Sequence, residues 1–186
     1  YTGEDTLSLH DALPISRLAA RYPAAARVML AHRLDLDTSG VVLVALDEES
    51  YRHLQAQFAA RTVRKRYVAW LAGEPATERG TVALPLRLDL DQRPRQVVDF
   101  IQGREAITDW KRLEVRNGRA RVALFPRTGR THQLRVHAAH PDGLGRPIVG
   151  DRLYGQPGER LLLHAESLTF MNLDGRRVTV SDPAPF

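Results

Sequence analysis

The dipeptide Asn117-Gly118 is the sequence feature that most constrains the fold, because it interrupts a run of alternating side chains over residues 110–124. Alternation with a period of two is typical of a strand with one buried face. Asn-Gly is preferred in the two-residue turn of a β-hairpin, and Asp174-Gly175 separates two further segments of this kind. Repeated hairpins with few helical stretches predict an α+β domain built on a largely antiparallel sheet.

Other segments predict short elements around this sheet. Residues 41–46 (VVLVAL) are apolar and rich in β-branched side chains, which predicts a buried strand. Asp47 is placed to cap a helix that should pack on the sheet. The apolar face of this helix has three members at helical spacing: Tyr51, Leu54 and Phe58. Residues 17–26 predict a short helix ended by a proline, and residues 88–96 predict a loop between two strand-rich halves.

Two segments carry candidates for chemistry. Residues 32–40 read HRLDLDTSG, and in an extended backbone Arg33 and Asp35 would face the same side. An isolated Arg-x-Asp pair is usually a weak surface ion pair, so this segment alone indicates little. Residues 128–140 (TGRTHQLRVHAAH) supply a second set, with Arg130, a further arginine and three histidines.

Together the two segments resemble the signatures of the RluA family of pseudouridine synthases. In that family HRLD-x-x-TSG carries the catalytic aspartate, and TGRTHQ-[IL]-RVH carries its arginine partner. The KRY of residues 65–67 matches a third signature, and RPIVGDRLYG (146–155) and LLLHAESL (161–168) continue the match. The resemblance extends from about residue 21 onward. It implies the pseudouridine synthase fold, a mixed and mostly antiparallel sheet with flanking helices and an active-site cleft.

The resemblance implies that uridine in RNA is isomerised to pseudouridine, with the base detached from nitrogen, rotated and rejoined through carbon. It assigns catalysis to Asp35, with Arg130 as its ion-pair partner and Tyr67 stacked on the flipped base. Arg33 would insert into the RNA, and Leu134 would pack against the base. A carboxylate beside a guanidinium stays ionised at neutral pH and can act as a nucleophile. Attack on the uracil ring, attack on the ribose anomeric carbon and glycal formation all remain open.

A basic cluster precedes Tyr67 at the start of an expected strand. Such a run is usually a solvated face, but Arg64, Lys65 and Arg66 could instead give RNA phosphates salt-sensitive affinity. The net charge of +5 leans modestly toward a polyanionic partner. Residues 93–114 resemble the subgroup that modifies both large-subunit rRNA and tRNA. The expected partner is therefore rRNA, tRNA or both.

We expect no metal and no organic cofactor. The chain has no cysteine, and it carries no P-loop, dinucleotide-binding or H-E-x-x-H signature. The three histidines His132, His137 and His140 have no adjacent carboxylate pair, which argues against a metal site. His32 and His164 are expected to make structural hydrogen bonds.

We also expect a monomeric, cytoplasmic protein. Membrane contact is not expected, because no run approaches the roughly 18 apolar residues of a membrane span and no signal-peptide pattern is found. Residues 6–15 (TLSLHDALPI) resemble one reading frame of a sequencing adapter. Residues 1–16 are therefore expected to be a non-native leader, the alternative being a divergent amino terminus. Residues 17–186 would then be a pseudouridine synthase catalytic domain, truncated before HRLD.

Two other function classes remain open at the level of sequence. A non-catalytic RNA-binding domain would bind RNA without any requirement for Asp35. A metal-dependent RNA phosphodiesterase would combine Asp35 with the histidines, would shorten RNA, and would stop when a chelator removes its metal.

Overall fold

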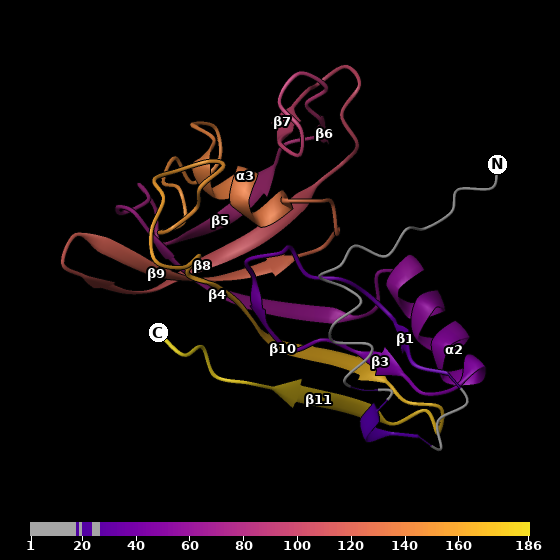
Figure 1. Ribbon diagram of the computed structural model, residues 1–186. Helices are drawn as coiled ribbons and strands as arrows, with labels where there is room; N and C mark the ends of the chain where they lie inside the picture. The colour runs from indigo at the N-terminus through magenta and orange to yellow at the C-terminus, as the bar shows by residue number, and fades with distance from the viewer. Residues whose placement is uncertain (1–17, 19, 24–26) are drawn as a thin grey trace. The chain divides into compact units, whose positions relative to one another are not determined.

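The computed structural model describes residues 18, 20–23 and 27–186, which fall into two compact units (Figure 1). The first unit takes residues up to 36, residues 42–63 and residues 170–178, and the second takes residues 37–41, 64–169 and 179–186. The expected leader at residues 1–16 lies outside the described residues. Of the short helix expected at residues 17–26, Leu18, Ala20 and Arg21 are helical, and Arg17, Ala19 and residues 24–26 lie outside the description.

The first unit pairs a small antiparallel sheet with one helix. The sheet consists of β1 (Met29–Leu30) and β3 (Val44–Ala45), and α2 (Glu48–Ala59) follows β3 directly. The N–H of Ser50 donates to Asp47 Oδ1 at 2.8 Å, which confirms the predicted cap. The core confirms the predicted apolar face of α2, since it combines Ala31, Leu43, Ala45, Tyr51, Leu54, Phe58 and Phe170.

The second unit is organised around a sheet with the strand order β11-β10-β4-β9-β8-β5, to which β2 adds beside β10. The strands are β2 (Ser39–Gly40), β4 (Arg64–Leu71), β5 (Arg79–Ala83), β8 (Ile107–Arg116), β9 (Arg119–Pro126), β10 (Leu163–Met171) and β11 (Arg177–Ser181). The ladders β10–β4, β4–β9, β9–β8 and β8–β5 are antiparallel, whereas β2 runs parallel to β10. The predicted largely antiparallel sheet is confirmed.

Both predicted hairpins are present. Arg116 pairs with Arg119 across the turn between β8 and β9, and Asn117 and Gly118 have φ angles of 51° and 69°. Two consecutive positive φ angles are the requirement of the type I′ turn that Asn-Gly favours. The strands β10 and β11 are neighbours and are joined by the turn that contains Asp174-Gly175.

The buried strand expected over residues 41–46 is wrong in its extent. Only Val44–Ala45 in that range forms a strand, and Val42 is exposed. The segment changes partners, because the N–H of Val41 donates to Ala165 of β10 whereas β3 pairs with β1. Local hydrophobicity does not reveal such a change of partner.

A smaller sheet and a short helix complete the second unit. The strands β6 (Leu86–Leu88) and β7 (Gln96–Val98) form an antiparallel hairpin. The loop expected over residues 88–96 therefore connects these two strands, rather than two halves of the domain. The helix α3 (Gln133–Ala139) is buried along most of its length, and it lies over the sheet with Leu134 and Ala138 in the main core (Figure 1).

Candidate active site

The HRLDLDTSG segment is divided between the two units. Its first five residues follow β1 in the first unit, where Arg33 is exposed and Asp35 is half-buried. His32 begins the segment, and its Nε2 accepts the N–H of Leu43 at 3.0 Å. Its ring lies 5.0 Å from the ring of Phe58, measured between centroids. The predicted structural hydrogen bond of His32 is thus present and anchors the start of this segment.

The end of the same segment belongs to the second unit and is bonded to β10. Ser39 Oγ lies 2.9 Å from His164 Nδ1, and Arg160 Nη2 donates to Ser39 Oγ at 2.9 Å. His164 Nε2 lies 2.9 Å from the carbonyl oxygen of Asp182. A carbonyl only accepts hydrogen bonds, so Nε2 carries a proton and donates it there. His164 therefore makes structural hydrogen bonds, as predicted, and links the TSG turn to the LLLHAESL segment.

The KRY segment lies in β4, which begins at Arg64, so the basic cluster forms part of the strand rather than preceding it. Lys65 Nζ donates to the carbonyl oxygen of Thr128 at 3.1 Å. Arg66 forms an ion pair with Glu166 of β10, whereas Arg64 is exposed. The structure thus brings the KRY and TGRTHQ segments into direct contact, and the three basic residues have different surroundings.

Gln133 fixes the loop that carries Arg130. Its amide makes four hydrogen bonds: Oε1 accepts the N–H of Arg130 at 3.0 Å and the hydroxyl of Thr128 at 2.7 Å, and Nε2 donates to Ile107 O at 3.0 Å and to Thr108 Oγ1 at 2.9 Å. These bonds use every hydrogen-bonding position of the amide. Arg130 Nε also donates to the carbonyl oxygen of Glu105 at 3.0 Å. Gln133 was not among the predicted site residues, and the Q of the TGRTHQ signature was the available signal.

Tyr67 and Leu134 both contribute to the main core of the second unit. Leu134, in the first turn of α3, is 8% exposed, and the half-buried Tyr67 packs against the same cluster. Tyr67 also pairs with Leu124 across the β4–β9 ladder. Contact of Tyr67 and Leu134 with a flipped base stays a prediction.

A buried ion pair joins α3 to the loop that precedes Tyr154. Arg135 Nε and Nη2 donate to the two carboxylate oxygens of Asp151 at 2.8 and 2.7 Å. Burial alone would raise the pKa of Asp151, but the hydrogen bonds and charge of Arg135, with the N–H groups of Leu153 and Tyr154, outweigh it and lower that pKa. Asp151 lies in the RPIVGDRLYG segment and was not among the predicted site residues.

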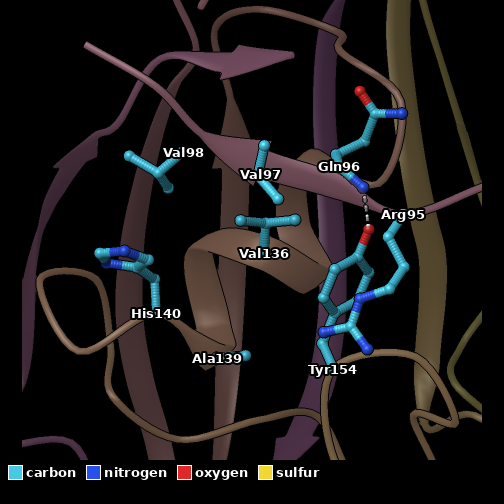
Figure 2. A pocket seen from close by; sticks show the side chains of 8 residues that line it. All are labelled: Arg95, Gln96, Val97, Val98, Val136, Ala139, His140 and Tyr154. Carbon is cyan, nitrogen blue, oxygen red and sulfur yellow. Dashed lines mark hydrogen bonds between the residues drawn. The ribbon is translucent and has the colours of Figure 1, made fainter. Parts of the chain in front are cut away.

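The second unit also contains a cavity of about 390 Å³ between β7 and α3 (Figure 2). Its lining combines valine side chains with polar groups at the edge: Arg95, Gln96, Val97, Val98, Val136, Ala139, His140 and Tyr154. These lining residues are different from the predicted site residues. The cavity therefore does not identify the predicted active site.

The three histidines of the TGRTHQLRVHAAH segment bond to different groups, and Nδ1 of His140 accepts the N–H of Asp142 at 3.2 Å. His132 Nδ1 lies 2.8 Å from the hydroxyl of Tyr154. His137 is bonded through Nδ1 to Thr108 Oγ1 at 3.0 Å and through Nε2 to the carbonyl oxygen of Leu84 at 3.1 Å. Within the described part of the chain, no group of three or more side chains has the arrangement of a metal site.

No described helix is long and apolar enough to span a membrane.

Known proteins match this chain over most of its length. The family described as RNA pseudouridylate synthase matches residues 12–140. The dual-specificity RNA pseudouridine synthase RluA of Escherichia coli (strain K12) is 43% identical over 187 residues, which cover 97% of this chain and 83% of that protein. An uncharacterized RNA pseudouridine synthase of Zymomonas mobilis is 42% identical over 161 residues, covering 84% of this chain and 73% of that protein.

Solved structures give the same result. The human RNA pseudouridylate synthase domain containing 1 superposes with a TM-score of 0.79 at 33% identity, covering 91% of this chain and 73% of that chain. The human domain containing 4 superposes with a TM-score of 0.77 at 26% identity, covering 94% and 78% of the two chains.

Proposed function

The chain belongs to the RluA family of RNA pseudouridine synthases, and we propose that it isomerises specific uridines of rRNA and tRNA to pseudouridine. The observation that carries this proposal is the 43% identity to the Escherichia coli enzyme across 97% of the chain. The name of that enzyme calls it dual-specificity, which agrees with the double substrate range predicted from residues 93–114. We further propose that the protein is cytoplasmic and acts as a monomer. Light scattering of the purified protein would test the monomeric state.

In this proposal Asp35 is the catalytic carboxylate and Arg130 is its ion-pair partner. The isomerisation breaks one carbon–nitrogen bond and forms one carbon–carbon bond, while a proton leaves the new attachment carbon and the freed nitrogen gains one. No atom is added and no electron is transferred to another molecule, so these side chains need no co-reactant. Attack of Asp35 on the ring, attack on the anomeric carbon and glycal formation all remain compatible with this balance.

The remaining predicted residues would deliver the base to Asp35. Unstacking a base costs a few kcal/mol, and insertion of Arg33 into the RNA would offset part of that cost. Tyr67 and Leu134 would receive the flipped uracil. Among the basic residues Arg64 is the best placed for phosphate contact because it is exposed, whereas Arg66 is already paired with Glu166.

The test measures pseudouridine formation in rRNA and tRNA transcripts, with and without a chelator, for three proteins. The wild type should form product, and Asp35→Asn should form none. The affinity of Asp35→Asn for RNA should stay within about threefold of wild type, because phosphate contacts supply most of that affinity. Asp91→Asn is the matched control, since it removes the same charge from an exposed loop, and it should keep full activity.

Each alternative class predicts a different result in this assay. Product formation by Asp35→Asn would exclude Asp35 as the catalyst. Shortened RNA that a chelator protects would favour the phosphodiesterase. Intact RNA that is bound by the wild type but never modified would favour a binding domain.

A further inference from the structure

Tyr154 contacts three separate segments of the second unit. Its hydroxyl accepts the N–H of Gln96, at the start of β7, at 2.7 Å, and it lies 2.8 Å from Nδ1 of His132, the residue that precedes α3. The guanidinium carbons of Arg95 and Arg135 lie 5.2 and 5.3 Å from the centroid of its ring. Figure 2 shows the bond from Gln96 and the position of Arg95 against the ring. The hydroxyl therefore bridges β7 and the start of α3.

The position of Tyr154 is itself determined by the buried ion pair. Asp151 Oδ1 accepts the N–H groups of Leu153 and Tyr154 at 2.9 and 3.1 Å, while the same carboxylate binds Arg135. The side chains of Arg135 and Asp151 are only 3% and 0% exposed. A turn fastened in this way to a buried helix holds the Tyr154 hydroxyl in one place.

What this hydroxyl holds is a strained residue close to Arg130. His132 has a φ angle of 53°, in the left-handed region that residues other than glycine seldom adopt. It is the N-cap of α3, and its side chain makes no cap hydrogen bond to the helix. The bond to Tyr154 is a side-chain interaction that favours this conformation, which sets the direction of the chain between Arg130 and α3.

We propose that Tyr154 is a positioning residue for the reaction, which acts through His132 to hold the loop of Arg130. The proposal rests on the proposed function, in which Arg130 pairs with the catalytic Asp35. Gln133 and Glu105 fix the backbone and the Nε of Arg130, and the bond from Tyr154 to His132 fixes the other end of the loop. Because misplacement of a catalytic group by about 1 Å can reduce the rate a hundredfold, loosening this end should reduce turnover.

The variant Tyr154→Phe tests this role, because it keeps the ring and its contacts with the two arginines but removes the hydroxyl. We expect kcat to fall by between about tenfold and a hundredfold, with KM and the affinity for RNA within about twofold of wild type. A residue that only supports the fold would lower the melting temperature and the fraction of active protein instead. Tyr22→Phe removes a hydroxyl from an exposed tyrosine and should leave kcat unchanged.

A second variant tests whether Tyr154 acts through His132. His132→Gly keeps a residue type that adopts positive φ readily, and it has no side chain to bond the Tyr154 hydroxyl. If both residues act through one bond, His132→Gly should lose as much kcat as Tyr154→Phe, and the double variant should lose no more than either. If one of the two single variants folds poorly, the kcat of the other still tests the bond.

The outcomes separate the two proposals. Full kcat in Tyr154→Phe, or losses that multiply in the double variant, would overturn the positioning role while wild type and Asp35→Asn behave as expected. Product formation by Asp35→Asn would instead overturn the proposed function, whatever Tyr154→Phe does.

Discussion

At the residue scale, the side chains that hold the site segments in place do so through contacts distant in sequence. Ser39 reaches His164, and Lys65 reaches Thr128. Asp35 was predicted from the family resemblance because it lies within one continuous motif of the sequence, residues 32–40. Gln133 joins its near neighbours Thr128 and Arg130 to Ile107 and Thr108, and residue types and spacing do not reveal these distant contacts.

Gly40 is a residue at which the structure permits only glycine. Its φ angle is 120°, and a Cβ atom added there would lie 2.3 Å from the carbonyl oxygen of Ala165. Gly40 ends β2, which pairs with β10 immediately after the segment that carries Asp35. A side chain at this position would therefore push β2 away from β10.

We expect Gly40→Ala to destabilise the protein by at least about 2 kcal/mol, since backbone strain and a steric clash with main chain act together. Gly118→Ala is the matched control, because its φ of 69° is also positive but its Cβ would meet open space. That variant should lose only about 1 kcal/mol. Urea unfolding of both variants would measure the difference, and equal losses would contradict the role of the Ala165 carbonyl.

At the element scale, what could be predicted from the sequence depended on whether a pattern was local. The Asn117-Gly118 hairpin and the Asp47 cap were predicted correctly because turn and cap chemistry act over a few residues. The strand over residues 41–46 was wrong because its two ends pair with different strands. The helix α3 was not predicted as an element. Its polar side chains Gln133, Arg135 and His137 are buried in the fold, where they hydrogen-bond to groups distant in sequence.

His137, within α3, predicts that stability depends on pH. Burial lowers its pKa below the ordinary value of 6.5, outweighing the hydrogen bond to Leu84 that raises it; the charge of His140 lowers it further. As the pH falls through 6.5, the unfolded chain therefore binds a proton that the folded chain excludes. Stability should consequently decrease on acidification in this range and increase with pH.

The measurement compares urea unfolding at pH 7.5 and at pH 5.5. His137→Gln should be less stable than wild type at pH 7.5, because a buried residue that hydrogen-bonds Thr108 is altered. Its loss of stability between the two pH values should nevertheless be smaller than that of wild type. His53→Gln, in the first unit, controls for the removal of a histidine. An equal loss in wild type and His137→Gln would show that His137 does not cause the pH dependence.

At the scale of the whole molecule, the chain alternates between its two units. Residues 37–41 belong to the second unit although the residues on both sides belong to the first. The catalytic domain expected over residues 17–186 gave no indication of this division, because the division follows from long-range contacts. Net charge, in contrast, is a property that the sequence supplies directly, and its value of +5 agrees with an RNA partner.

The net charge alone does not say where RNA lies, and Arg64 allows that question to be tested. Its side chain is exposed beside the KRY segment, so replacement by alanine should remove about one phosphate contact. We expect Arg64→Ala to weaken RNA binding and to reduce the slope of log K against log salt by about one unit.

Arg119→Ala is the matched control, because it removes the same charge from an exposed position at the turn between β8 and β9. It should leave the salt slope unchanged if RNA contacts the start of β4. Equal changes in both variants would mean that RNA responds to total charge, and Arg64 would then have no specific place in the interface. A loss confined to Arg64→Ala would place a phosphate at the same strand that carries Tyr67, as insertion of a flipped base toward Tyr67 requires.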